Sequence, residues 1–256
     1  MKLYHGNCFE VMKDIPDGSI DLILCDLPYG VTANPKDVAL PFDLLWNHYK
    51  RLTKPNGAIL LFAQGLFFVD LVNSNRKMFR YDLVWDKVIS TGFLNARRMP
   101  LRRHEQIAVF YKKLPQYNPQ YFEGPPLHSR GVSFQKKELK NANYGRFTPG
   151  DDVRAGSTTK FPVSVLTFPK PHPSVSLHPT EKPVALLEWL IRTYSNVGDT
   201  VLDNCMGSGS TGIACLRTGR EFIGIEIDDH YFDVAKNRIE NFQFQKEVPH
   251  PIEKYA

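Results

Sequence analysis

The chain has 256 residues, of which 42% are hydrophobic, and a net charge of +5. It shows neither an apolar run long enough to span a membrane nor a basic N-terminal region before a cleavable apolar core, so we expect a soluble, cytoplasmic protein. No Cys-x-x-Cys pair or metal-ligand spacing of histidines is present, so we expect no metal and no structural disulfide among Cys8, Cys25, Cys205 and Cys215.

The N-terminal part of the chain alternates strand patterns with helical spacing. The nearly continuous apolar run Ile20–Cys25 is typical of a strand that is covered on both faces. Further strand patterns lie at residues 1–6, 57–63, 81–85 and 106–111, and helical spacing lies at 9–15, 44–52 and 67–72. This alternation predicts βαβ units and an open, parallel α/β sheet.

The composition changes between Lys113 and Pro183, where eleven of the 19 prolines lie. From Lys112 to Val175 there are ten Lys or Arg residues against four Asp or Glu residues, a balance of +6, so a polyanionic partner would meet this part first. Beyond it, regular patterns return. A helix is expected from Pro183, followed by a strand at 200–203, a helix at 210–218, a strand at 221–227 and a helix at 232–242.

The tetrapeptide Asp26-Leu27-Pro28-Tyr29 closes the buried strand and suits transfer of an electrophilic group to a planar, conjugated amine. Asp26 can accept one amine hydrogen. Leu27 precedes a proline and is therefore extended, so that its carbonyl can accept the other. Two acceptors would favour the positively charged transition state of the amine, and Tyr29 offers a flat face for the base, a role that does not need its hydroxyl.

These residues make the chain similar to the amino-group DNA methyltransferases, whose catalytic motif is Asp/Asn/Ser-Pro-Pro-aromatic. Leu27 departs from that motif, which removes one rigidifying ring but keeps the carbonyl acceptor. The resemblance implies catalytic roles for Asp26, Leu27, Pro28 and Tyr29. A covalent cytosine-C5 mechanism is not expected, because no cysteine follows a proline.

The segment Gly207-Ser208-Gly209-Ser210-Thr211-Gly212 follows an expected strand and opens an expected helix. Read literally it is G-x-G-x-x-G, so an NAD-binding domain is one alternative. Too little chain follows for a complete dinucleotide domain, and the sheet must be completed by the N-terminal strands. The fold we predict is therefore a circularly permuted, doubly wound, Rossmann-like methyltransferase sheet with a basic, proline-rich insertion. The order of its parts resembles the β-group of amino DNA methyltransferases.

The resemblance implies S-adenosylmethionine as the cofactor. Asp203, Gly207 and Gly209 match the family's Asp-Pro-Phe-x-Gly-Ser-Gly segment, whereas Asn204 and Cys205 depart from it. Glu226 is similar to the ribose-binding acid, and the alternative for it is a solvated acid at the end of a strand. The expected cofactor-binding residues are Asn7, Cys8, Asp26, His178, Thr180, Lys182, Asp203, Cys205, Gly207, Gly209, Glu226 and Ile227.

We expect residues 1–112 to form the catalytic half of the domain, 113–176 a target-recognition insertion, and 177–256 the cofactor-binding half. Double-stranded DNA is the expected partner, and a homodimer stays open. The alternative for the basic insertion is a solvated loop. The expected DNA-binding residues are Arg97, Arg98, Arg102, Arg103, Lys136, Lys137 and Lys140.

Our functional hypothesis is methylation of adenine N6 in DNA by direct transfer after base flipping. The alternatives are cytosine-N4 methylation, methylation of RNA or a protein glutamine, and a degenerate scaffold that only binds nucleic acid. Trp85-Asp86-Lys87 and His104-Glu105 resemble the segment beside the target-base pocket. A tryptophan in a strand is more often part of the core, so we leave both segments out of the catalytic set.

Overall fold

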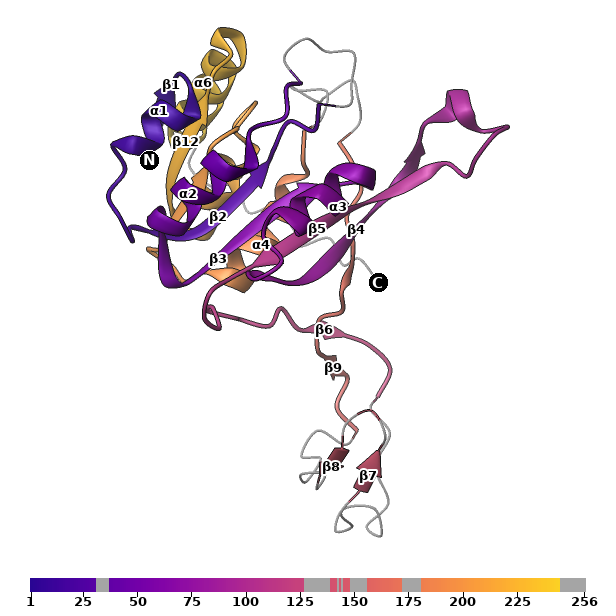
Figure 1. Ribbon diagram of the computed structural model, residues 1–256. Coiled ribbons are helices and arrows are strands. Elements are labelled where there is room, and N and C mark those ends of the chain that lie inside the picture. Colours follow the sequence, from indigo (N-terminus) through magenta and orange to yellow (C-terminus); the bar gives the residue numbers. More distant parts are fainter. Residues whose placement is uncertain are drawn as a thin grey trace. The chain divides into compact units, whose positions relative to one another are not determined.

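The computed structural model of the chain describes residues 1–30, 37–126, 139–141, 143, 145–147, 156–171 and 181–244. It divides into two compact units. Within the described residues, the larger contains Met1–Asn118 and the chain from Val163 to Phe244, and the smaller lies within Pro119–Pro162 (Figure 1). The larger unit therefore contains both parts of the chain in which regular strand and helix patterns were predicted, the part before the proline-rich region and the part after it.

The elements of the larger unit alternate along most of the chain, as the sequence predicts. Its strands are β1 (Lys2–His5), β2 (Ile20–Asp26), β3 (Thr53–Ala63), β4 (Phe79–Thr91), β5 (Arg102–Phe110), β10 (Val165–Thr167), β11 (Thr200–Asp203) and β12 (Glu221–Glu226). Its helices are α1 (Cys8–Lys13), α2 (Phe42–Leu52), α3 (Gly65–Ser74), the 3-10 turn η1 (Phe93–Asn95), α4 (Val184–Tyr194), α5 (Ser210–Thr218) and α6 (Asp229–Phe244).

The smaller unit has little regular structure within its described residues. It contains two short antiparallel pairs, β6 (Phe122–Glu123) with β9 (Thr159–Lys160) and β7 (Leu139–Asn141) with β8 (Gly145–Phe147). The rings of Tyr121 and Phe161 lie 5.1 Å apart beside the first pair. The scarcity of regular elements agrees with the proline-rich composition of this part.

In the described part of the chain, one sheet of eight strands runs in the order β1-β12-β11-β2-β3-β5-β4-β10. Neighbours from β1 to β3 are parallel, and β5 is antiparallel to both β3 and β4. The late strand β11 lies beside the early strand β2, so the sheet is completed across the two ends of the chain. This gives the doubly wound α/β sheet that the sequence predicts, whereas its origin by circular permutation stays a prediction.

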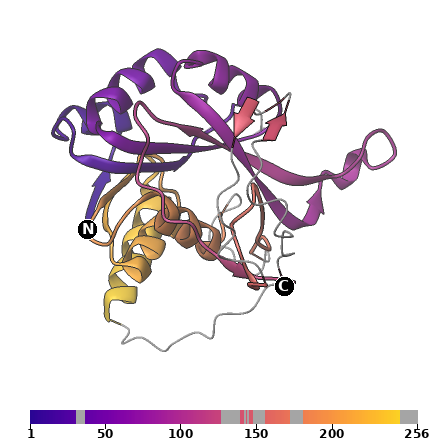
Figure 2. The same cartoon turned by 90° about the horizontal axis from the view of Figure 1, so that it is seen from below.

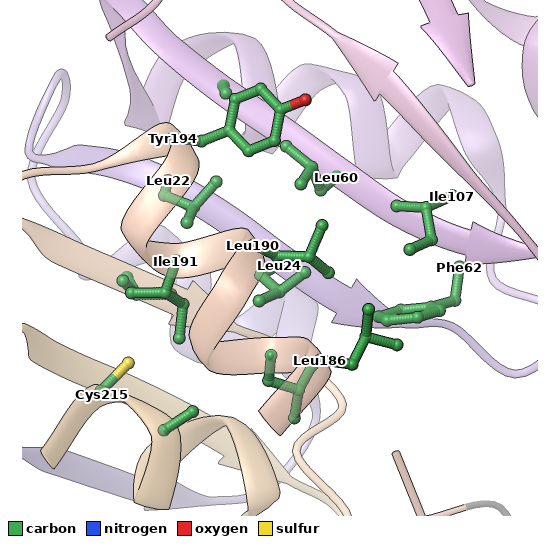
Figure 3. Close-up of a cluster of buried hydrophobic side chains, with 14 of the residues drawn as sticks. Leu22, Leu24, Leu60, Phe62, Ile107, Leu186, Leu190, Ile191, Tyr194 and Cys215 are labelled. Carbon is green, nitrogen blue, oxygen red and sulfur yellow. The ribbon is translucent and has the colours of Figure 1, made fainter. Parts of the chain in front are cut away.

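Helices cover both faces of this sheet, as Figure 2 shows. Successive residues of β2 point to opposite faces: Leu22 and Leu24 belong to one core cluster, and Ile23 and Cys25 belong to the other. Residues from α4 and α5 pack on the first face (Figure 3), and residues from α1, α2 and α3 pack on the second. A strand that is buried on both sides needs a continuous apolar run, which explains the pattern at residues 20–25.

Two features differ from the predicted elements. The sheet is not fully parallel, because β4 and β5 form a long antiparallel hairpin. Strand β3 begins at Thr53, directly after α2, whereas the sequence predicts a strand only from Gly57. The register between β2 and β3 shifts near Ile20, and a Cβ on Gly57 would lie 2.7 Å from the Asp21 carbonyl oxygen. The strand can therefore continue past Pro55 because a glycine fits against β2 at this irregularity.

The predicted insertion at 113–176 is wider than the second compact unit. Val165–Thr167 form β10, which pairs in parallel with β4 and thus belongs to the large sheet. Asn118 also belongs to the larger unit, where its amide donates to the carbonyl oxygens of Arg192 and Ser195. The structure therefore places Pro119–Pro162 in the smaller unit.

Candidate active site

A cavity of about 970 Å³ follows the edge of the sheet at which the parallel strands end. It is lined by the last residues of β12, β11 and β2, namely Glu226, Asp203 and Asp26, and by Glu105 of β5. After β2 the chain continues to β3 on one side, whereas after β11 it continues to β12 on the other side, so the strand order reverses between β11 and β2. The helices that follow these two strands cover opposite faces of the sheet. Open α/β sheets bind their ligands at such a switch point.

Asp26 lies at the end of β2 with both carboxylate oxygens engaged. The Tyr29 hydroxyl donates to Oδ1 at 2.9 Å, and the Lys182 ammonium donates to Oδ2. The Tyr29 ring stacks on Phe67 with centroids 4.7 Å apart and an interplanar angle of 27°. The Tyr29 hydroxyl therefore orients the carboxylate, a role that the sequence did not suggest.

Lys182 connects Asp26 to a second carboxylate. Its Nζ lies 3.4 Å from Glu105 Oε2, and Lys87 Nζ lies 3.3 Å from Glu105 Oε1. The Lys87 and Lys182 side chains are only 5% and 8% exposed. The result is an alternating row of charges, Lys87–Glu105–Lys182–Asp26, that comes from β4, β5, the residue before Pro183 and β2.

Burial and these neighbours shift the pKa of each carboxyl in the row differently. Burial raises the pKa of Asp26, and Glu105 adds to the rise, although Lys182 opposes it. For Glu105, burial is again the largest effect, but Lys182 and Lys87 together outweigh it and lower the pKa. For Lys182, the two carboxylates outweigh the opposing effect of burial and raise the pKa. Glu105 and Lys182 are therefore charged at neutral pH, and Asp26 is the carboxyl of the row whose pKa is shifted upward.

The glycine loop lies between β11 and α5 and is tied to the sheet by two buried acids. Asp203 accepts hydrogen bonds from the backbone amide of Cys205 at 3.2 Å and from the Thr211 hydroxyl at 2.7 Å. Burial raises the pKa of Asp203 to about 6. Gly209 has a φ of +77° and is the N-cap of α5. The loop thus presents its backbone to the cavity at the start of a helix, where polar ligand groups can approach closely.

Glu226, at the end of β12, is held by three backbone amides. Gly207 donates to Oε2 at 2.8 Å, and Ile227 and Asp228 each donate to Oε1 at 2.9 Å. The side chain is therefore not a mobile acid in solvent, which was the alternative interpretation. It faces the same cavity as the glycine loop.

The remaining predicted cofactor residues lie around this part of the cavity or outside the described residues. Asn7 caps α1 by accepting from the Phe9 amide at 2.9 Å, and Cys8, Cys205 and Ile227 line the wall. His178 and Thr180 lie outside the described residues. The structure brings the others together, and their roles stay predictions.

The predicted DNA-binding arginines lie on or beside the hairpin of β4 and β5, which projects from the sheet (Figure 1). Arg103 Nε lies 2.7 Å from Asp86 Oδ1, and Arg102 donates to Gln64 at 3.3 Å. Arg97 and Arg98 are exposed near the tip, beside η1. Lys136 and Lys137 lie outside the described residues, and of Lys140 the structure describes only its place in β7.

Sequence reasoning missed several residues that hold the site together. Lys87 and Glu105 were left out of the catalytic set because their segments could be structural. A lysine and a glutamate on two consecutive strand segments were the signal that could have indicated a paired site. Glu181 was not singled out, yet it pairs with Arg238 at 2.8 Å and accepts from Ser210 at 3.1 Å. It thereby docks the segment that carries Lys182 onto the glycine loop and α6.

The sequence model of the DNA methylase family, which covers N6 and N4 enzymes, matches residues 20–237. The chain belongs to this family. It is 28% identical to the DNA adenine methyltransferase YhdJ of Escherichia coli K12, over 93% of this chain and 82% of that protein. It is also 28% identical to the type II methyltransferase M.HpaI of Haemophilus parainfluenzae, over 94% of this chain and 74% of that protein.

Solved structures share the fold. The complex of M1.HpyAVI with S-adenosylmethionine matches with a TM-score of 0.63 and 25% identity, over 93% of this chain and 98% of the other. The cytosine-N4-specific PvuII DNA methyltransferase matches with a TM-score of 0.65 and 16% identity, over 97% of this chain and 87% of the other. The chain is thus a DNA methyltransferase of the N6/N4 family that uses S-adenosylmethionine.

The cavity suits this cofactor. Its volume of about 970 Å³ lies near the upper end of the usual range for small-molecule sites, roughly 300 to 1,000 Å³. Gly207, which lines the cavity with a φ of +50°, and a fixed carboxylate at the end of the next strand suit close approach of a nucleoside and hydrogen bonding to its ribose. In the described part of the chain, no helix is both long enough and apolar enough to cross a membrane.

Proposed function

We propose that the protein methylates the exocyclic N6 of adenine in DNA by direct transfer to a flipped base. The observation that carries the proposal is the position of Asp26, which shares one cavity with the glycine loop and Glu226. The choice of adenine is supported by the similarity to the adenine methyltransferase YhdJ and by an aspartate at the first motif position.

In this proposal, Asp26 accepts one hydrogen of the target amine, and the carbonyl of Leu27 accepts the other. The bound S-adenosylmethionine supplies an electrophilic methyl group on a positively charged sulfur. Asp26 would stabilise electrostatically the positive charge that grows on the amine nitrogen as the methyl group passes to it and the methyl–sulfur bond breaks, which leaves the neutral thioether S-adenosylhomocysteine. The raised pKa of Asp26 then suits it to take the proton that the methylated amine releases.

Tyr29 has two roles in this proposal. Its hydroxyl holds Asp26 Oδ1 in place, and its ring, supported on one face by Phe67, offers a surface on which the flipped base stacks. A ring that is already packed loses little conformational freedom when the base arrives. Pro28 fixes the backbone between the carboxylate and the ring.

We assign the roles in cofactor binding according to where each residue lies in the cavity. Glu226 is the ribose acceptor that we propose, because three amides fix its carboxylate in the cavity wall. Asp203 acts indirectly, since its hydrogen bonds to Cys205 and Thr211 shape the glycine loop. Asn7, Cys8 and Ile227 lie at the wall that the adenosine portion would occupy.

We assign DNA recognition to the basic insertion and to the arginines of the β4–β5 hairpin. The charge balance of +6 over residues 112–175 suits contact with phosphates. Within the smaller unit, Tyr121, Phe122 and Phe161 are 53%, 46% and 50% exposed, so aromatic surface is available near Lys160. Basic and aromatic side chains together suit binding of phosphates and bases.

The experiment is to replace Asp26 with alanine or asparagine and to measure single-turnover methylation of DNA together with cofactor affinity. We expect the rate to fall at least about 100-fold, because the carboxylate acts mainly in the transition state. Cofactor affinity should change little. Asp233→Ala, which removes an exposed carboxylate of α6, is the control and should keep the wild-type rate. A fully active Asp26→Ala would overturn the proposal.

A further inference from the structure

The row of charges behind Asp26 raises a problem of access. Oδ1 of Asp26 accepts from Tyr29 at 2.9 Å, and Oδ2 accepts from Lys182. Each oxygen keeps a free lone pair, but the buried ammonium of Lys182 competes with a target amine for Oδ2, the oxygen that Tyr29 does not use. Lys182 is 8% exposed, and an ammonium left without a carboxylate in such a place is strongly destabilising.

Glu105 offers the displaced ammonium a second partner. Its Oε2 lies 3.4 Å from Lys182 Nζ, and none of the residues that the structure describes donates a well-directed hydrogen bond to this buried oxygen. Its other oxygen, Oε1, is held by Lys87 at 3.3 Å. Glu105 is therefore fixed at one oxygen and able to accept at the other.

The backbone beside Lys87 supports this arrangement. The pairing of β4 with β5 is irregular between Asp86 and Thr91, and Val88 has a φ of 67°, which is unusual for a β-branched residue. The amide of Val88 donates to Asp86 Oδ1 at 2.9 Å. Such strain is found where the surrounding structure imposes a conformation, and here it directly follows the residue that holds Glu105.

We propose that Glu105 is a positioning residue, which receives Lys182 from Asp26 when the target amine binds and so makes Asp26 available to that amine. The inference rests on the proposed role of Asp26. During the exchange every buried charge keeps a partner, because Lys182 passes between two carboxylates that it already contacts. Glu105 does not touch the reacting atoms in this scheme.

Removing the charge of Glu105 has a predictable effect on the acidic limb of the pH profile. The described ionisable groups around Asp26 are Lys182, Tyr29, Glu105, Cys25 and Asp203, and Lys170 acts on both Glu105 and Lys182. Of these, Glu105 raises the pKa of Asp26 and Lys182 lowers it. Without the charge of Glu105, Asp26 protonates only at lower pH, so the limb moves to lower pH.

The test is Glu105→Gln, which keeps the size of the side chain and removes its charge. Single-turnover rates should fall roughly 10- to 100-fold, the range for losing a hydrogen bond to a charged group, while cofactor affinity stays within about threefold. The acidic limb of kcat/KM should move to lower pH, whereas Glu105→Asp, which keeps the charge, should leave it near the wild-type position. Glu10→Gln, which removes an exposed partner of Lys13, is the control.

A purely structural role for Glu105 would lower Tm and cofactor affinity together with activity, and would do so in Glu105→Asp as in Glu105→Gln. That result, or a wild-type single-turnover rate in Glu105→Gln, would overturn the inference. Should Glu105→Gln fail to fold, Lys87→Met combined with Glu105→Gln removes one acid and one base and should show the same movement of the limb. Asp26→Asn is measured alongside. If Asp26→Asn is inactive and Glu105→Gln behaves as the wild type, only the role of Glu105 fails; if Asp26→Asn is active, the proposed function fails with it.

Discussion

Replacing Gly209 with alanine tests how the glycine loop is held against the helices. A Cβ at this position would lie 3.0 Å from the Cβ of Ala235 and 3.2 Å from its Cα, and the backbone φ is +77°. The left-handed conformation costs an L-residue about 1 to 2 kcal/mol, and overpacking adds about 1 to 3 kcal/mol. We therefore expect the free energy of unfolding to fall by about 2 to 5 kcal/mol.

Thermal unfolding followed by circular dichroism measures this loss. In a protein of this size, 1 kcal/mol corresponds to about 2 to 4 °C in Tm, so Tm should fall by roughly 5 to 15 °C. Gly198→Ala is the matched control, because Gly198 has a φ of +85° and a Cβ there would meet nothing within 4 Å. It should lose only the backbone contribution, about 1 to 2 kcal/mol.

Calorimetry with S-adenosylmethionine completes the comparison. Gly209→Ala displaces the start of α5 and should weaken cofactor binding at least about tenfold, the factor that corresponds to 1.4 kcal/mol. Gly198→Ala lies away from the cavity wall and should bind as the wild type does. Equal Tm values for the two variants would refute the argument that contact with Ala235 constrains the loop.

Three further predictions concern single groups and the basic insertion. Tyr29→Phe removes the hydrogen bond to Asp26, so we expect single-turnover rates to fall at least about tenfold; a wild-type rate would show that the hydroxyl has no part in orienting the carboxylate. Because burial raises the pKa of Asp203 from 3.8 to about 6, its contribution to stability is fully present below pH 3.8 and is lost as the pH rises through about 6. Asp203→Asn should thus gain about 3 kcal/mol relative to the wild type between pH 4 and pH 7 in urea titrations, and a constant difference would contradict the shift. Replacing Lys136, Lys137 and Lys140 with alanine should flatten the slope of log affinity for DNA against log salt by about 0.9 per lost phosphate contact; an unchanged slope would remove the insertion from the DNA interface.

The central strands were predictable because burial on both faces demands a continuous apolar run. Residues 20–25 show that run, and β2 occupies Ile20–Asp26. The antiparallel direction of β5 was not predictable, because strand patterns at 81–85 and 106–111 carry no information on direction and the hairpin between them is long. The start of β3 was missed because Pro55-Asn56-Gly57 is typical of a helix end, and only the fit of Gly57 against β2 shows why the strand continues.

The candidate site, like the fold, contains residues that could be proposed from the sequence and residues that could not. Asp26, Tyr29, Gly209 and Glu226 could be proposed from the sequence, because each follows a strand or opens a helix in a pattern that has a chemical reason. The pairing of Lys182 with Asp26 and Glu105 could not be found, since it joins three positions that are distant in the chain and meet only when the sheet is assembled. Sequence reasoning assigned Lys182 to the cofactor, whereas the structure shows its ammonium between two carboxylates.

The most direct test of the central claim is to identify the methylated base. Purified protein is incubated with unmethylated genomic DNA and S-adenosylmethionine labelled in its methyl group, and the DNA is then digested to nucleosides that are separated and identified by mass spectrometry. The account predicts label in N6-methyladenine, and none when Asp26 is replaced with alanine. Label found only in N4-methylcytosine, or no label in DNA at all, would contradict it.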